Sequence, residues 1–203
     1  WEKMVMSQDG VNKARRTLLV GATAGVGAVG AGFLAVPFVK SWMPSEKAKA
    51  AGAPAKIDVS KVEPGAMVTA EWRGKPVYVA RRTDDMLNTL EGLADRLKDP
   101  ENANKAQQPE YADNLYRSRK PELIVLLGVC THLGCAPKYI PEVQPQPFDP
   151  NWQGGWFCPC HGSRFDLSGR VYGGSPASDN LIVPAYMFES ENVVVVGVDE
   201  ENA

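Results

Sequence analysis

The pattern of apolar and polar positions divides the chain into an apolar N-terminal run, a polar connection and a region of short strands. The uncharged run from Thr17 to Val39 is longer than the about 20 residues with which an α-helix crosses a hydrocarbon core. Basic residues precede the run and one follows it, at Lys13, Arg15, Arg16 and Lys40. Positive charge favours the cytoplasmic side of a membrane helix. We therefore predict a transmembrane helix over 17–39, with 1–16 in the cytoplasm and the rest on the periplasmic side of the inner membrane.

The two adjacent arginines allow a second interpretation of this run. Arg15 and Arg16 before a weakly apolar, Gly-rich stretch are also typical of a twin-arginine export signal, which can be cleaved. The stretch exceeds the about 7–15 residues of an ordinary signal core, which favours a retained anchor. Twin-arginine export would also fit a protein that folds around a cofactor before transport.

The polar connection is rich in Ala, Lys, Pro and Gly and offers few apolar side chains to bury. We predict a linker over 40–57, which would act either as a hinge or as a passive spacer.

Beyond the linker, β-favouring runs at 67–72 and 75–81 flank Arg73-Gly74 and predict a hairpin. Further strands are predicted at 123–129, 155–158, 170–172, 181–186 and 193–198. Their spacing indicates a small antiparallel all-β domain over 58–203 without a βαβ rhythm.

One helix interrupts the predicted strands. Behind Asp84, apolar residues recur at helical spacing, at Met86, Leu87, Leu90, Leu93, Ala94 and Leu97. We predict an amphipathic helix over 84–97 whose apolar stripe packs on the sheet rather than binding a partner. The polar stretch 99–120 is predicted to be an irregular surface excursion.

The charge balance and the placement of cysteine and histidine narrow the class of protein. The chain has 22 Lys and Arg against 24 Asp and Glu and no long basic run, so nucleic acid is not an expected partner. All 4 Cys and both of the 2 His fall between positions 130 and 161. Such clustering indicates a shared chemical site rather than scattered core side chains.

Two short motifs carry these six side chains: Cys-Thr-His-Leu-Gly-Cys at 130–135 and Cys-Pro-Cys-His-Gly-Ser at 158–163. A tetrahedral metal needs four ligands, so two donors are left over, and spare cysteines in an oxidising periplasm are expected to pair. Zinc fits poorly, because its common patterns lack this spacing and a spare Cys pair. Disulfides alone leave both histidines unexplained. An iron-sulfur cluster is therefore favoured, with zinc and disulfides as the alternatives.

The two motifs resemble the cluster-binding loops of Rieske proteins. Together with the anchor, the linker, the 84–120 insertion and Gly-Gly-Ser-Pro-Ala-Ser at 173–178, nearly the whole chain is similar to the Rieske iron-sulfur subunits of bacterial cytochrome bc complexes, the ubiquinol-cytochrome c reductases. The resemblance implies an all-β Rieske domain of antiparallel sheets. In it, 128–178 would form a cluster-binding subdomain on a base domain, with one helical insertion and a single N-terminal transmembrane helix.

The resemblance also implies a Rieske-type 2Fe-2S cluster. Its expected metal ligands are Cys130 and Cys158 on one iron and His132 and His161 on the other, while Cys135 and Cys160 would form a disulfide between the loops. Two neutral imidazoles in place of thiolates raise the reduction potential to roughly −150 to +300 mV, which suits a quinol donor. The catalytic contact is assigned to His161, which would accept a hydrogen bond from the quinol and take its proton.

Further positions next to the cluster follow from the resemblance: Leu133, Gly162, Ser163 and Pro176. Ser163 matches a hydroxyl that donates to a bridging sulfur and raises the potential. Phe165 stands where high-potential relatives commonly have a Tyr whose hydroxyl points at a ligand cysteine, so we predict a lower potential for this chain. Gly173-Gly174 begins the third loop where the family often has Gly-Pro.

The resemblance implies electron transfer within a larger enzyme. The reduced domain would leave a quinol pocket on the b-type cytochrome subunit and carry its electron to a c-type cytochrome subunit, contributing to proton translocation by a homodimeric membrane complex. Three alternatives are the Rieske subunit of a periplasmic molybdenum oxidase such as arsenite oxidase, a soluble Rieske ferredoxin and a zinc-stabilised interaction module. A retained anchor and the 84–120 insertion argue against the first, and the anchor and second Cys pair argue against the second.

Overall fold

The computed structural model describes residues 13–199 and divides the chain into two compact units, 1–49 and 50–203. The first unit contains α1 (Lys13–Ser41), whose residues are all exposed. By length and composition, α1 lies in the only described segment apolar enough to cross a membrane. Burying its exposed Leu, Val and Phe side chains in lipid would remove this apolar surface from water. The predicted span 17–39 lies within α1. Residues 1–12 of the predicted cytoplasmic segment lie outside the described residues.

The connection after α1 is more structured than the predicted linker. It contains α2 (Glu46–Ala51), and the Ser45 hydroxyl accepts a hydrogen bond from Ala48 N at 3.2 Å. Its end forms β1 (Ala55–Asp58), which pairs antiparallel with β9 (Val193–Val196) and buries Ile57. This pairing corrects the predicted boundary at residue 57. The only local signal is the Lys-Ile-Asp alternation, which is too short to identify a strand whose partner lies at the other end of the domain.

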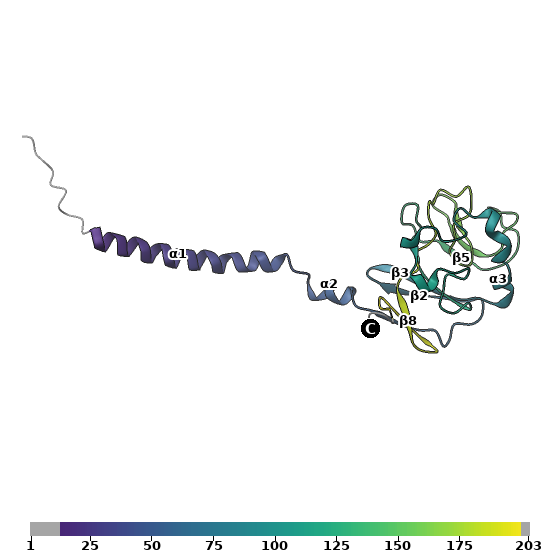
Figure 1. Ribbon diagram of the computed structural model, residues 1–203, viewed down its shortest axis with the longest axis horizontal. Coiled ribbons are helices and arrows are strands. Elements are labelled where there is room, and N and C mark those ends of the chain that lie inside the picture. The colour runs from purple at the N-terminus through teal and green to yellow at the C-terminus, as the bar shows by residue number, and fades with distance from the viewer. Residues whose placement is uncertain (1–12, 200–203) are drawn as a thin grey trace, which may run out of the picture. The chain divides into compact units, whose positions relative to one another are not determined.

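Two three-stranded antiparallel sheets form the base of the second unit (Figure 1). One has the order β1-β9-β8, where β8 is Tyr186–Ser190, and the other is β2 (Met67–Trp72), β3 (Lys75–Arg81) and β4 (Leu123–Leu127). The predicted hairpin is confirmed: Arg73 and Gly74 have φ of 52° and 71°, as a two-residue type I′ turn requires. Every residue of β4 is buried, so both of its faces are covered.

A third antiparallel sheet carries the second cysteine motif. It is formed by β5 (Lys138–Ile140), β6 (Gly155–Cys158) and β7 (Ser163–Phe165), in that order. The strand predicted at 155–158 is confirmed, whereas β5 and β7 are too short to show a clear alternation. Trp156 and Phe165 face each other across β6 and β7, and both are fully buried in the core shared with the base sheets.

The predicted helix over 84–97 is divided in two. Helix α3 (Asp84–Asn88) is capped by Thr83 rather than by Asp84, and a 3₁₀ helix, η1 (Glu91–Arg96), follows it. Thr89 Oγ1 donates to Met86 O at 2.8 Å, and this bond competes with continuation of the α-helix. The apolar stripe is buried at Met86, Leu90, Leu93 and Leu97, whereas Leu87 is only partly buried and Ala94 is exposed.

Two other predicted segments differ from the structure. The stretch 99–120 is irregular, with short 3₁₀ helices η2 (Lys105–Gln107) and η3 (Glu110–Ala112), but it buries Asn102, Gln108, Ala112 and Arg117 and is therefore not a surface excursion. The strand predicted at 170–172 forms only isolated bridges, and of the strand predicted at 181–186 only Tyr186 is in a strand, as the first residue of β8. Ile182 O accepts from Leu127 N at 2.8 Å, and Pro184, which lacks an N–H, precedes the start of β8.

Candidate metal centre

The first motif lies in loop 1, which we define as residues 128–137 between β4 and β5. Cys130 N donates to Cys135 O at 2.8 Å, and Gly134 N donates to Cys130 O at 2.9 Å. Gly134 has a φ of 84°, in the left-handed region that a side chain would disfavour. These contacts fold residues 130–135 into a closed turn with both cysteines at its base.

The second motif lies in loop 2, residues 159–162, which joins β6 to β7. Cys158 and Ser163 face each other where the two strands end, and Gly162 N donates to Cys158 O at 2.9 Å. Gly162 has a φ of 78°, which allows the chain to reverse directly after His161. Loop 2 therefore projects its histidine from the end of a short hairpin.

The structure joins the loops by a disulfide between Cys135 and Cys160, as the resemblance implies. The Sγ atoms of these two residues and of Cys158 all lie within 4.8 Å of one another. Sulfurs in a disulfide are poor metal ligands, because the metal-binding form of cysteine is the thiolate. The cysteines that remain free are Cys130 and Cys158, each 2% exposed.

The free thiols and the imidazoles form a donor set that suits an iron-sulfur cluster. Burial raises the pKa of the Cys158 thiol, and the neighbouring Cys130 thiol adds to this rise, so two thiolates side by side need a compensating cation. The rings of His132 and His161 lie 4.7 Å apart and nearly perpendicular, at 89°. His132 Nδ1 is buried and has no hydrogen-bond partner within residues 13–199, which fits a nitrogen that binds metal.

The other predicted site residues occupy different positions around the loops. Leu133 is 71% exposed at the tip of loop 1, and Gly162 and Pro176 lie at least partly exposed in loop 2 and in loop 3, which we define as residues 173–178. Ser163 is fully buried, and its Oγ accepts a hydrogen bond from Ala177 N at 3.0 Å. Because the hydroxyl accepts this bond, its own proton is still available for a cluster sulfur.

Two residues that hold loop 3 or the residue directly after it were not identified from the sequence. Lys98 Nζ donates to Ser175 O at 2.6 Å and to Ala177 O at 2.7 Å. Thr131 Oγ1 in loop 1 donates to Asp179 O at 2.6 Å. Thr131 lies inside the cysteine motif and could have been considered, whereas the sequence around Lys98 carries no signal for such a contact.

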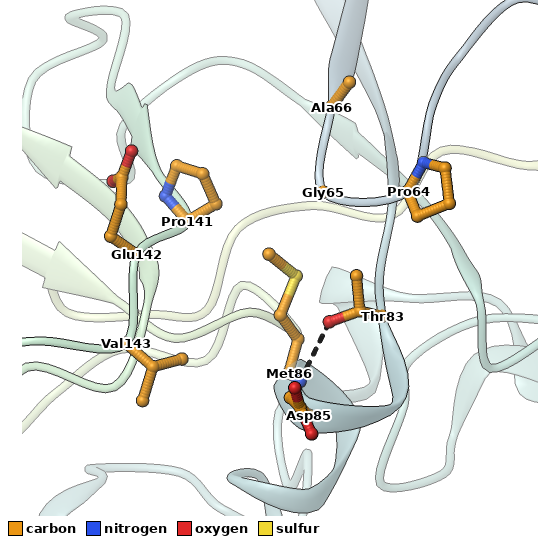
Figure 2. A pocket seen from close by; sticks show the side chains of 9 residues that line it. All are labelled: Pro64, Gly65, Ala66, Thr83, Asp85, Met86, Pro141, Glu142 and Val143. Carbon is orange, nitrogen blue, oxygen red and sulfur yellow. Dashed lines mark hydrogen bonds between the residues drawn. The ribbon is translucent and has the colours of Figure 1, made fainter.

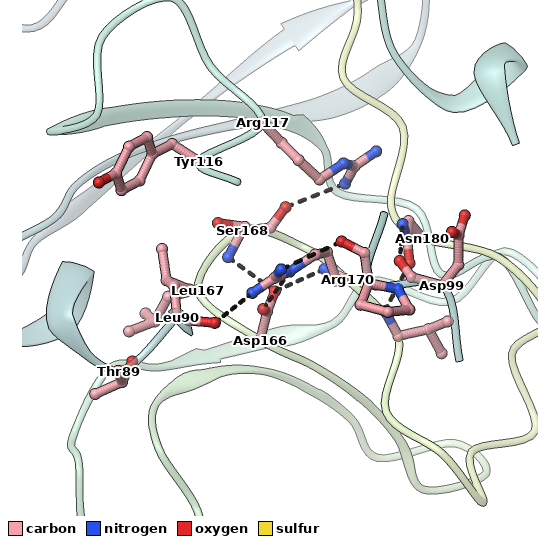
Figure 3. A network of polar contacts seen from close by, with 12 residues as sticks. Thr89, Leu90, Asp99, Tyr116, Arg117, Asp166, Leu167, Ser168, Arg170 and Asn180 are labelled. Carbon is pink, nitrogen blue, oxygen red and sulfur yellow. Dashed lines mark hydrogen bonds and ion pairs between the residues drawn. The ribbon is translucent and has the colours of Figure 1, made fainter. Parts of the chain in front are cut away.

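A network of buried charges follows β7 (Figure 3). Arg170 Nε and Asp166 Oδ2 lie 2.8 Å apart, and their side chains are 2% and 0% exposed. Burial lowers the pKa of Arg82 to about 10 and that of Arg117 to about 10, and the Asp166 carboxylate opposes both shifts. Arg82 donates to carbonyl and hydroxyl oxygens, including Leu167 O at 3.1 Å and Ser168 Oγ at 3.0 Å. One buried carboxylate thus compensates three buried guanidinium groups.

A hollow on the second unit lies away from the cysteine and histidine loops (Figure 2). It has a volume of about 490 Å³ and lies between the turn at Pro64, the start of α3 and the segment 141–143. Met86 points into it, opposite Pro141 and Val143 (Figure 2). None of the four predicted ligands lines this hollow, so it is not a quinol pocket next to the cluster loops.

The paired loops, the disulfide between them and the β-sheet base define the class of protein, a Rieske [2Fe-2S] protein. The Rieske [2Fe-2S] domain family matches residues 94–187, and a family described as ubiquitinol-cytochrome C reductase Fe-S subunit TAT signal matches residues 5–45. The chain is 50% identical over 198 residues to the ubiquinol-cytochrome c reductase iron-sulfur subunit of Allochromatium vinosum. The match covers 98% of this chain and 95% of the relative. The chain belongs to the family of ubiquinol-cytochrome c reductase iron-sulfur subunits.

Two further matches accompany this assignment. The iron-sulfur subunit of the same name from Blastochloris viridis is 40% identical over 192 residues, which cover 94% of this chain and 97% of the relative. Among solved structures, a chain of a hyperthermophilic respiratory Complex III is 28% identical, with a TM-score of 0.46, and the match covers 87% of this chain and 98% of that chain.

Proposed function

We propose that this chain is the electron-transfer subunit of a quinol-cytochrome c oxidoreductase and that Cys130, His132, Cys158 and His161 hold its 2Fe-2S cluster. The observation that carries the proposal is the pair of buried free thiols, Cys130 and Cys158, at the base of two disulfide-joined loops with the two imidazoles side by side. When bound, such a cluster supplies a one-electron acceptor with a potential of roughly −150 to +300 mV, within reach of a quinol donor.

The chain's own residues would orient the quinol and receive its proton. His161 is exposed, so its outward ring nitrogen can accept a hydrogen bond from a quinol hydroxyl and then hold the proton. Leu133 presents an exposed apolar side chain on the neighbouring loop, which suits insertion into an apolar pocket of a partner subunit. The Ser163 hydroxyl accepts a hydrogen bond from Ala177 N, so it would be able to donate a hydrogen bond to a cluster sulfur and stabilise the reduced state.

Membership of this family implies a b-type cytochrome, a c-type cytochrome and quinol as partners, and a membrane-anchored chain fits the apolar helix α1. We place the N-terminus in the cytoplasm and the Rieske domain in the periplasm of the inner membrane, because Lys13, Arg15 and Arg16 precede the span. Assembly as a homodimeric complex that contributes to proton translocation belongs to the same proposal.

The connection between α1 and β1 is proposed to act as a hinge that lets the domain alternate between its two cytochrome partners. Support comes from its composition and from the short α2, whose described side chains, at residues 46–50, are all exposed. Several added prolines within 52–54 are expected to slow cytochrome c reduction while leaving the cluster spectrum unchanged. Normal turnover in this variant would count against the hinge.

The test of the proposed function is electron paramagnetic resonance of the dithionite-reduced protein in membranes, with and without a quinol-site inhibitor. We expect a rhombic signal that shifts when the inhibitor binds, because His161 would contact the occupant of the quinol site. Absence of a signal in a metal-replete sample would refute the cluster. A signal that does not respond to the inhibitor would instead favour a Rieske subunit with a different electron donor.

A further inference from the structure

Loop 1 closes on itself between Cys130 and Cys135, but its two ends are held by a side chain of the base sheet. That side chain is Tyr78 of β3, which is 6% exposed. We propose that Tyr78 is a positioning residue that ties the first and last residues of loop 1 together and thereby fixes the place of Cys130 and His132. The link from loop position to cluster rests on the ligand set proposed above.

The phenol ring covers the first residue of the loop. Tyr78 pairs with Leu126 across β3 and β4, and two residues further on Gly128 N donates to Pro76 O at 2.8 Å. A Cβ atom on Gly128 would overlap the Cζ, Cε1 and Cε2 atoms of the Tyr78 ring. Gly128 does not belong to the glycines with positive φ. Glycine is therefore needed here to admit the ring, and not because of the backbone conformation.

The phenol hydroxyl reaches the last residue of the loop. Tyr78 Oη donates to Pro137 O at 3.0 Å, and this bond is buried. A buried carbonyl that loses its donor pays a desolvation cost, so the bond strongly favours one position of Pro137. One rigid side chain thus contacts Gly128 with its ring and Pro137 with its hydroxyl.

These contacts lie close to the proposed ligands along the chain. Cys130 follows Gly128 by two positions, Cys135 precedes Pro137 by two positions, and the bond from Cys130 N to Cys135 O, at 2.8 Å, joins the two sides. A displacement at either end of the loop therefore carries through this turn to His132, whose ring packs 4.7 Å from that of His161. A side chain that merely filled the core would not couple the ends in this way.

The first test compares Tyr78→Phe with Tyr111→Phe in the full chain, purified with its cluster. Both variants keep the ring and lose a hydroxyl, but the Tyr111 hydroxyl accepts from Tyr186 N at 2.8 Å in the base and does not contact loop 1. We expect Tyr78→Phe to raise hydrogen exchange at the Cys130 and Gly134 amides about fivefold, which corresponds to the loss of one net hydrogen bond. The paramagnetic resonance lines of the reduced cluster should also broaden or shift. Tyr111→Phe should change neither readout.

Equal exchange in loop 1 for Tyr78→Phe and the unsubstituted chain would overturn the proposal, and so would equal changes in both variants. If the unsubstituted chain shows no cluster signal, the proposed ligand set fails, while the exchange comparison still decides whether Tyr78 holds the loop.

The second test perturbs one end of loop 1 and observes the turn within it. In Gly128→Ala, the added methyl group must displace the Tyr78 ring and withdraw its hydroxyl from Pro137. We expect faster exchange at the Gly134 amide, which donates to Cys130 O at 2.9 Å and lies in the second half of the loop. Unchanged protection at Gly134 would show that displacement of the Tyr78 ring does not reach the turn that holds the ligands and would overturn the proposal.

Discussion

Asp166→Asn tests whether one carboxylate holds the charged core together. Asp166 Oδ1 accepts from Ser168 N at 2.9 Å and from Arg170 N at 2.7 Å, while Oδ2 faces Arg170 Nε at 2.8 Å. Asparagine would keep the oxygen that accepts the two backbone bonds. Its NH₂ group would face the guanidinium, which leaves three buried cations without a buried carboxylate.

Removing one member of a buried ion pair costs about 3–5 kcal/mol. Because the two backbone bonds at Asp166 persist in the variant, we expect the lower end, about 3 kcal/mol. For a chain of this size, that corresponds to a fall of about 6–12 °C in the unfolding temperature. Burial already lowers the pKa of Arg82 to about 10, so this charge is costly to bury even with Asp166 present.

The assay is calorimetric unfolding of the detergent-solubilised chain, with Asp113→Asn as the matched control. Asp113 pairs with Lys105 at 2.6 Å, but the two side chains are 32% and 64% exposed. An exposed pair of this kind contributes about 0–1 kcal/mol, so the control should unfold within a few degrees of the unsubstituted chain. Equal unfolding temperatures for the two variants would refute the role assigned to Asp166.

Three further predictions concern the cluster loops and the cores around them. Phe165→Tyr should raise the midpoint potential by about 40 mV, the one-electron equivalent of about 1 kcal/mol from one hydrogen bond to a ligand cysteine, and a redox titration without an upward shift would contradict it. The double substitution Cys135→Ala with Cys160→Ala opens a cross-link of sequence separation 25. It should cost about 3.5 kcal/mol, seen as bleaching of the visible cluster spectrum at a lower temperature; an unchanged bleaching temperature would count against it. Burial raises the pKa of Tyr139 from 10.0 to about 12, so its contribution to stability is complete below pH 10 and is lost as pH rises toward 12. Tyr139→Phe should therefore lose less unfolding free energy between pH 9 and pH 11.5 in urea titrations than the unsubstituted chain, and parallel losses would disprove this account.

The parts of the fold that the sequence predicted are those with a local signal. The hairpin at 67–81 has a turn dipeptide between two β-favouring runs, and both the pairing and the turn conformation are confirmed. The end of the linker was placed too late, because β1 is defined by its pairing with β9 and not by its own residues. The helix predicted at 84–97 buries most of its apolar stripe but has the wrong length, since hydrophobic spacing does not reveal that the Thr89 hydroxyl bonds back to Met86 O.

In the candidate site, too, some residues could be predicted from the sequence and others could not, and the kind of contact that each residue makes explains the difference. Thiols and imidazoles are rare side chains at fixed spacing, so the sequence alone brings the four proposed ligands together. The side chains that hold the loops, Tyr78, Lys98 and Thr131, are ordinary residues, and each donates to a backbone carbonyl. A carbonyl is present at every position, so the acceptor leaves no trace in the sequence. It follows that substitutions at the acceptor positions should be tolerated better than loss of the donors, because only the donor side chain carries the contact.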